Sequence, residues 1–423
     1  MKYLYKSFIS ALICIVGLSI SHAQFSLTAE LRPRSELRNG YRVPRSADSK
    51  SAFFISQRTR LNLSFQNSKI QLFISPQDIR VWGAEKQLGS DPSFSLHESW
   101  GLVRLSDKVA VKAGRQELVY DGHRLLGNVN WVQQARSHDA LLFKYAHEGF
   151  KFDVGSAFNQ SAEKVFTTHY RPDNYKALTF LHLQNGSDKV SWNGMIISDA
   201  NEKSDIDHDL SWRHTIGGGL SYSLKNFNTE GSAYFQTGNT KMDQNISSFL
   251  FSVKGQYQFT GFAASAGLDF VSGDDPKDSD YQAFNTLFAT NHKFYGFMDY
   301  YLNVPVDTKN GGLQDYFVGV DVKASSTSTL KLFYHQFFLA NDVINPSTPE
   351  EISRGNLGGE LDMVFGHKIS PFASMNMGFS MYFPNSTTVQ IKGGDKDAIN
   401  TWGWIMLTVN PEIWNSKSQN PQK

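Results

Sequence analysis

The segment Phe25-Ser26-Leu27-Thr28-Ala29-Glu30-Leu31-Arg32 alternates strictly, with apolar residues at odd positions and polar or charged residues at even ones. The same alternation occurs in residues 56–65 and, close to the other end of the chain, in residues 373–383. A period of two predicts β-strands, because successive side chains of a strand point to opposite faces of the sheet. Since the alternation recurs along the whole chain after its N-terminal segment, we expect an all-β protein.

The links between the expected strands are alternately short and long. We expect about 18 strands between residues 25 and 410, an even number as in single-chain bacterial barrels. The long links are residues 37–52, 82–93, 119–136, 162–175, 200–210, 273–312, 340–354 and 384–398. This asymmetry is typical of a closed antiparallel transmembrane β-barrel with short periplasmic turns and long outer loops. A closed sheet also satisfies every backbone group in lipid. The pattern therefore predicts the outer membrane of a Gram-negative bacterium and makes a pore the leading function.

Two segments depart from the simple pattern. Pro76 interrupts a strand, and the apolar parity changes on either side of it, which predicts a β-bulge. Residues 292–301 could form one more strand, but an odd count would break the alternation of short and long links. We therefore place residues 292–301 inside the longest loop. The pattern leaves open whether that loop plugs the pore.

The N-terminal residues 1–23 are predicted to be a secretory signal peptide. Lys2 and Lys6 give a basic start, an apolar core follows, and residues 21–23 form a small-x-small cleavage site. The alternative, a membrane anchor, is disfavoured because the apolar stretch is too short to span comfortably. Residues 24–423 then form one barrel domain with a polar tail from about residue 415.

Composition narrows the function classes. Removal of the two signal-peptide lysines changes the formal net charge from +1 to −1, which argues against a nucleic-acid partner. The single cysteine, Cys14, lies in the signal peptide, so we expect no disulfide and no thiolate metal ligand in the mature chain. Aromatic residues make up 13% of the chain, which fits a barrel with aromatic girdles at both membrane interfaces.

Charged residues opposite the aliphatic face of each strand are expected to point into the lumen, because charge on the lipid face is costly. The inward set includes Arg32, Arg34, Arg58, Arg60, Lys144, Arg213, Lys254, Asp315 and Glu360. Bases crowd the first strands and acids the last, and these strands are neighbours in a closed barrel. We expect the four arginines to recognise anions, since guanidinium groups suit carboxylates and phosphates. The alternative is that the charges pair with one another and only brace the wall.

Several short motifs are more specific than the barrel pattern. They are Gly114-Arg115-Gln116-Glu117-Leu118, Leu126-Gly127-Asn128-Val129-Asn130-Trp131, Gln134-Ala135-Arg136-Ser137-His138-Asp139-Ala140 and Phe270-Val271-Ser272-Gly273-Asp274. In this order they resemble the alginate-export family of outer-membrane β-barrel porins, over essentially the whole mature chain. The resemblance implies an 18-stranded barrel with an arginine-rich, anion-selective constriction.

The resemblance also implies that Arg115 and Arg136 belong to the pore. Strand parity instead places Arg115 outward, and a bulge or a position at the rim would reconcile the two. We favour an inward Arg115, because an arginine that faces lipid is costly. The acidic residues of the late strands also point into the lumen, and they argue against a channel that admits only polyanions.

These observations together predict a monomeric passive channel in outer-membrane lipid for anionic saccharides or small acidic solutes. One alternative is a general or nutrient-uptake porin of low selectivity, and a remote one is a secreted all-β carbohydrate-binding protein. The sequence contains no Gly-x-Ser-x-Gly and no His-Glu-x-x-His motif, so we expect no enzyme and no cofactor. Residues 274–280 could hold calcium, but Lys277 and the order of the acids favour a solvated turn, and we expect no metal site.

Overall fold

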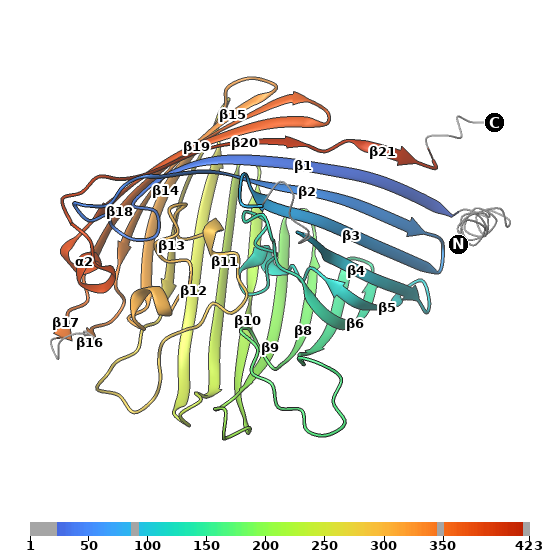
Figure 1. Cartoon of the computed structure of the whole chain (residues 1–423), viewed down its shortest axis with the longest axis horizontal. Coiled ribbons are helices and arrows are strands. Elements are labelled where there is room, and N and C mark those ends of the chain that lie inside the picture. Colours follow the sequence, from blue (N-terminus) through green and yellow to red (C-terminus); the bar gives the residue numbers. More distant parts are fainter. Residues whose placement is uncertain (1–22, 86–92, 345–350, 418–423) are drawn as a thin grey trace.

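The computed structural model describes residues 23–85, 93–344 and 351–417, and the predicted signal peptide therefore lies, but for Ala23, outside the described residues. Eighteen antiparallel strands form a closed barrel, which confirms the predicted fold class (Figure 1). The first nine strands are β1 (Gln24–Asn39), β2 (Ala52–Gln66), β3 (Ile70–Val81), β4 (Phe94–Arg104), β5 (Val109–Gln116), β6 (His138–His147), β7 (Phe150–Phe158), β8 (Ala177–Gly186) and β9 (Val190–Glu202). The others are β10 (Leu210–Leu224), β11 (Phe227–Asn239), β12 (Asn245–Gln258), β13 (Phe262–Val271), β14 (Leu313–Lys323), β15 (Ser328–Phe338), β18 (Asn356–Ser370), β19 (Ala373–Pro384) and β20 (Asn400–Val409).

The barrel closes where the last strand meets the first. β1 pairs with β2 on one side and with β20 on the other. A short segment, β21 (Glu412–Asn415), continues the line of β20 and pairs with the start of β1. Because β20 and β21 share one partner strand end to end, they act as a single interrupted strand of the barrel.

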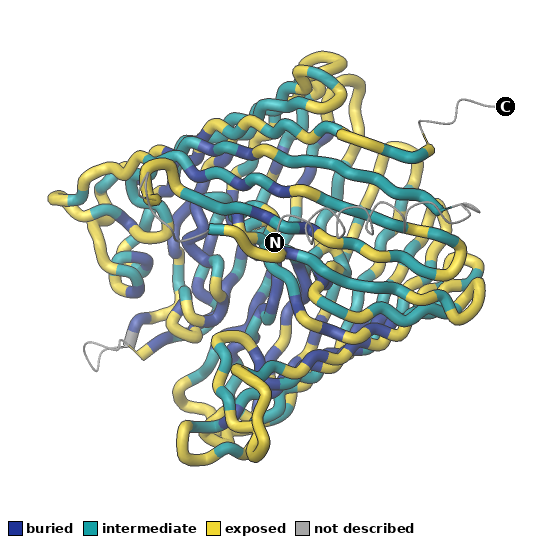
Figure 2. The backbone as a smooth tube through the Cα atoms, turned by 45° about the vertical axis from the view of Figure 1, so that its right-hand side comes forward, coloured by how far each residue is buried: buried dark blue, intermediate teal, exposed yellow. Residues whose placement is uncertain are grey.

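The two faces of the wall differ as the alternation predicts. On β6, Leu141 is 54% exposed whereas Leu142 is 3% exposed, because the first points outward and the second points into the filled lumen. Exposed apolar side chains of this kind recur around the outside and include Leu72, Ile74, Phe143, Ile216, Phe249, Val318 and Ile405. In Figure 2 the buried positions recur at intervals along the strands, and the turns and loops at the barrel ends are mostly exposed.

The short turns lie at the same end of the barrel as both described ends of the chain, and the long loops lie at the other end (Figure 1). The pairing of β3 with β4 shifts register between Ser75 and Pro76, which confirms the predicted bulge. Short elements occur in the long loops: η2 (Asp121–His123), η3 (Asn291–Lys293), η4 (Val306–Thr308), β16 (Val343–Ile344), β17 (Glu351–Ile352) and α2 (Ser386–Lys392). Over the described residues, no helix has the length and apolar character needed to cross a membrane.

Two long loops fold into the barrel and bind each other. They are residues 117–137, between β5 and β6, and residues 272–312, between β13 and β14, and we call the pair the plug. The backbone N–H of Gly127 donates to the Phe288 carbonyl at 2.9 Å, and the N–H of Phe288 donates to the Leu125 carbonyl at 3.0 Å. The plug also contributes much of the buried apolar core, including Leu125, Leu126, Phe284, Tyr295, Met298, Tyr300 and Tyr301. Residues 292–301 thus lie inside the longest loop, as predicted, and this loop enters the lumen.

Candidate functional site

The first two strands carry four buried arginines, Arg32 and Arg34 on β1 and Arg58 and Arg60 on β2, which we call the arginine wall. Arg32 Nη1 donates to the Asn130 carbonyl at 2.9 Å, and Arg34 Nη1 donates to the Trp131 carbonyl at 2.6 Å. The Arg34 guanidinium also lies 4.0 Å from the centre of the Trp131 ring. The side chains are on the inner face, but they bind the backbone of the plug rather than open solvent.

The two arginines of β2 are also engaged by protein groups, Arg58 by Glu30 and the plug and Arg60 by a side chain of β3. Arg58 is 0% exposed, its Nη2 lies 2.6 Å from Oε1 of Glu30, and its Nη1 donates to the Gln133 carbonyl at 3.3 Å. Arg60 donates from Nε and Nη2 to Oε1 of Gln77 at 3.1 and 2.6 Å. Carboxylate and amide oxygens thus occupy guanidinium groups that the sequence suggested for solute anions.

The late strands hold the other plug loop through acids. Asp315 on β14, with Glu360 and Asp362 on β18, forms what we call the acidic wall. The backbone N–H of Met298 donates to Oε1 of Glu360 at 2.7 Å, and the N–H of Phe297 donates to Oδ2 of Asp362 at 3.3 Å. These carboxylates therefore fix the tip of the loop that spans residues 272–312.

Gly296 allows this close approach. Its φ is +76°, a left-handed conformation that side chains disfavour, and a Cβ at this position would lie 2.6 Å from the carboxyl carbon of Glu360. Within the acidic wall, Asp315 accepts from the His335 ring of the adjacent strand β15 at 2.9 Å. The acidic wall thus contacts both the plug and its own neighbours, and no residue larger than glycine fits at position 296 unless the loop or the Glu360 side chain shifts.

Other residues of the predicted site act as braces. Arg213 makes two hydrogen bonds to the Asp199 carboxylate, at 3.0 and 2.7 Å, across β10 and β9. Lys144 pairs with Asp153 on the adjacent strand β7. Arg136 belongs to the plug, where its Nη1 donates to the Ala289 carbonyl at 3.2 Å and so links the two plug loops.

Our expectation that Arg115 faces the pore is wrong. Its side chain is 47% exposed and lies on the outer face, with the same parity as exposed Leu141 on the adjacent strand. Arg115 Nη2 lies 2.8 Å from Oδ2 of Asp139, its cross-strand partner. The position is close to the loop end of β5, and the paired carboxylate neutralises the charge, so the cost of an outward arginine is reduced.

A cavity of about 420 Å³ remains between the plug and the wall of strands β8 to β15. Its charged lining comes from both parts: Asp121, Arg124 and Lys293 from the plug, and Glu230, Lys254 and Asp269 from the wall. Four phenylalanines, Phe294, Phe297, Phe317 and Phe333, line it as well. Of the residues that we predicted for the site, Lys254 lies here.

The charges of this cavity are not all paired. Arg124 Nη1 lies 2.9 Å from Oδ2 of Asp269, and its guanidinium covers the Phe294 ring at 3.7 Å. Burial alone would lower the pKa of Arg124, but the Asp269 carboxylate raises it above the ordinary value, so Arg124 stays charged. Lys254 and Lys293 have no ion pair among the described residues. The pKa of Lys293 is lowered below its ordinary value, mainly by burial and also by Arg124 and Lys254. Glu230 opposes this shift.

The plug residues Asp121, Arg124 and Lys293 were missed because they lie outside the strands. Parity assigns a face only to residues of a regular strand, and a loop residue has no such period. One signal was available in the sequence. Arg124 and Lys293 each stand in a long link, directly before a pair of apolar or aromatic residues.

Comparison with known proteins agrees with this architecture. A family model described as Alginate export matches residues 23–397. The chain belongs to the alginate export family. This membership confirms the resemblance that the motifs indicated, and with the porin-like barrel it makes the chain an outer-membrane channel. No curated protein matches this alginate export family member in sequence.

Solved structures show the same fold at low sequence identity. The outer membrane protein OprD from Pseudomonas aeruginosa aligns with a TM-score of 0.64 and 14% identity, over 92% of this chain and 94% of OprD. OccK8 (OprE) from the same organism gives 0.62 and 8%, over 92% and 98% of the two chains. OccK3 (OpdO), also from P. aeruginosa, gives 0.62 and 11%, over 92% and 96%. At these identities the likeness of the family member to the three proteins concerns the fold alone.

Proposed function

We propose that this outer-membrane channel conducts small acidic saccharides or similar small acids by passive diffusion, through the cavity beside the plug. The observation that carries this proposal is that two lysines and only one carboxylate of that cavity lack an ionic partner among the described residues. Lys254 and Lys293 have no ion pair among the described residues, whereas Glu230 is the one lining carboxylate without a hydrogen-bonded or ionic partner there. These two ammonium groups favour entry of a carboxylate, because they can replace part of its hydration.

The size and composition of the cavity support small solutes rather than a polymer. A volume of about 420 Å³ is within the range of sites that enclose a small molecule. The phenylalanines offer apolar faces beside the polar groups, as a solute with both hydroxyls and C–H faces requires. The two plug loops are tied to each other and to both walls, which leaves a polymer little free cross-section.

A second candidate is a nutrient porin of low selectivity. The six formal charges of the cavity are three basic and three acidic residues, so their sum is zero. If Glu230 and Lys254, which face each other across β11 and β12, shield one another in the conducting state, the preference for anions is lost.

Reversal potentials in a salt gradient across planar bilayers test the proposal. We expect weak anion preference for the native channel, and loss of that preference for the double variant Lys254→Gln with Lys293→Gln. The control is Lys396→Gln, which removes an exposed loop lysine paired with Asp397. In liposomes, glucuronate should enter faster than glucose at equal concentration. Equal entry rates, or a double variant with unchanged selectivity, favour the low-selectivity porin.

We also propose that the barrel functions as a monomer in outer-membrane lipid. The apolar side chains exposed on its outer face occur on strands around the circumference, which suits contact with lipid on all sides. The mass of the folded protein in detergent, corrected for bound detergent, checks this proposal, and a dimeric or trimeric mass contradicts it.

A further inference from the structure

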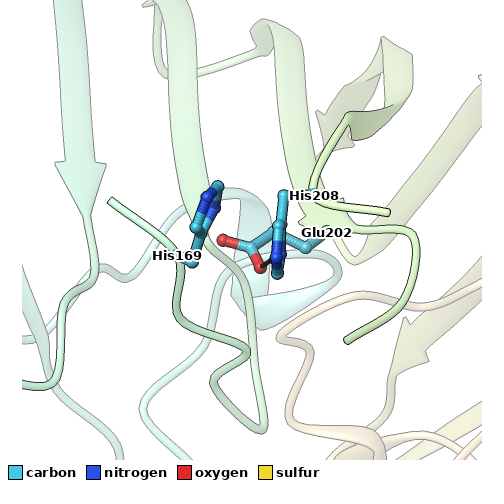
Figure 3. A group of neighbouring side chains, drawn as sticks. All are labelled: His169, Glu202 and His208. Atoms are coloured by element: carbon cyan, nitrogen blue, oxygen red, sulfur yellow. Dashed lines mark hydrogen bonds and ion pairs between the residues drawn. The ribbon is translucent and has the colours of Figure 1, made fainter. Parts of the chain in front are cut away.

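Two loops at the outer end of the barrel bring two histidines and a glutamate together (Figure 3). His169 lies in the loop between β7 and β8, Glu202 ends β9, and His208 lies in the loop between β9 and β10. One nitrogen from each ring and one carboxylate oxygen all lie within 4.8 Å of one another. These side chains do not line the cavity and have no part in the proposed conduction.

Two of the three side chains, His208 and Glu202, already have the spacing of neighbouring metal ligands. His208 Nδ1 lies 3.1 Å from Oε2 of Glu202. Two ligands of a tetrahedral zinc ion, with bonds of about 2.0–2.1 Å, are separated by roughly 3.3 Å. The His169 ring stacks on the His208 ring, with centroids 3.5 Å apart and planes at 21°. His169 is exposed, and its ring nitrogens have no hydrogen bond among the described residues, so the ring is free to turn a nitrogen toward the carboxylate.

We propose that His169, Glu202 and His208 bind a divalent transition-metal ion, with Zn²⁺ the best chemical match. Two imidazoles and one carboxylate are a ligand set that zinc accepts, with water in the remaining position. A hard ion such as Ca²⁺ or Mg²⁺ prefers oxygen ligands and fits this set poorly.

The surroundings hold Glu202 in a ligating orientation. The carboxylate is 3% exposed, and its Oε1 accepts from the Tyr170 N–H at 2.8 Å. The Lys176 ammonium lies 4.0 Å from the same Oε1 and donates to Gln160 Oε1 at 3.0 Å. Oε2 therefore remains available on the histidine side. Such outer contacts fix the orientation of a ligand, and their loss commonly weakens metal binding by about 10- to 100-fold.

A metal ion at this position links two outer loops that already touch. Arg171 Nη1 lies 2.6 Å from Oδ1 of Asp205, across the same two loops. The ion adds a second connection, between His169 on one loop and His208 on the other. We therefore expect zinc to order residues 159–176 and 203–209 without a change in the barrel.

Titration calorimetry with zinc chloride, on the untagged protein in detergent, tests the site. We expect one site per chain, and affinity at least about tenfold weaker in His169→Ala, His208→Ala and Glu202→Gln. His147→Ala is the matched control, because His147 also lies beside a glutamate, 3.7 Å from Glu148, but has no second histidine.

Cobalt replacement gives an independent readout. Co²⁺ bound by two imidazoles and a carboxylate in a four- or five-coordinate site absorbs visible light much more strongly than hydrated Co²⁺, and zinc should abolish that absorption. Heat-modified mobility on a gel shows whether each variant is folded. A native chain that binds no zinc, or a folded His169→Ala/His208→Ala variant that binds as tightly as the control, overturns the proposal.

Discussion

The arginine wall and the acidic wall hold the same plug through opposite backbone groups. Arg32 and Arg34 donate to carbonyl oxygens at residues 130 and 131, whereas Glu360 and Asp362 accept from the N–H groups of residues 298 and 297. A guanidinium has only donors and a carboxylate only acceptors, so each wall matches one polarity of the backbone. The difference teaches that an uneven distribution of charge around a lumen can position inserted loops. Such charges are then not direct evidence for recognition of a charged solute.

The largest effect should come from the arginine wall. In Arg32→Ala with Arg34→Ala, the carbonyl groups at residues 130–132 lose charge-assisted donors, and each unsatisfied buried group costs about 1–3 kcal/mol. We expect the loop of residues 117–137 to loosen and single-channel conductance to rise several-fold. The barrel should remain folded, because the lipid face is unchanged. Unaltered conductance in a folded variant would show that the arginines do not seat the plug.

A change in the acidic wall should be somewhat smaller and should affect the other loop first. In Glu360→Ala the Met298 N–H loses its acceptor, at a cost of about 1–3 kcal/mol for one group. Hydrogen exchange should quicken at residues 296–299 more than at residues 130–133. Equal exchange in both segments would mean that the loops move as one unit, through their hydrogen bonds at residues 125–127 and 288.

Acidification provides a milder way to loosen the loop of residues 272–312 alone. Asp299, in the plug, accepts from His292 at 2.7 Å and from Tyr41. Burial alone would raise its pKa, but His292, Tyr41 and Arg42 together lower it below the ordinary value. A carboxyl whose folded pKa is lowered stabilises the fold above its unfolded pKa of about 3.9, and this contribution is lost as the pH falls through the folded pKa.

We therefore expect the loop of residues 272–312 to loosen below about pH 4, as seen in faster proteolysis or higher conductance. Asp299→Asn removes this titration and serves as the comparison. If the pH dependence is the same in Asp299→Asn and in the native chain, another group controls the acid response.

The smallest effect should come from the arginine outside the lumen. Arg115→Ala removes an exposed ion pair with Asp139, and such pairs contribute about 0–1 kcal/mol. Conductance and ion selectivity should equal those of the native channel. A change in reversal potential comparable to that of the cavity lysine variants would place Arg115 in the conduction path after all.

Much of the fold follows from local pattern. The period of two identifies the strands and their inner and outer faces, because each strand must present one side to lipid and one to the interior. The alternation of short and long links predicts the even count and the closed sheet. Pro76 indicates the register shift between β3 and β4, since proline cannot donate in a ladder.

The use of the lumen was decided only by tertiary structure. Parity placed Arg32, Arg34 and Arg58 on the inner face, but only the folded chain brings residues 130–133 onto them. The acids of β18 likewise meet residues 297 and 298, which no local pattern brings close. The cavity combines plug residues such as Lys293 with wall residues such as Lys254. A strand has a period that the sequence displays, whereas an inserted loop is positioned by contacts with residues far away along the chain, so the sequence alone determined the barrel and the folded structure decided what fills it.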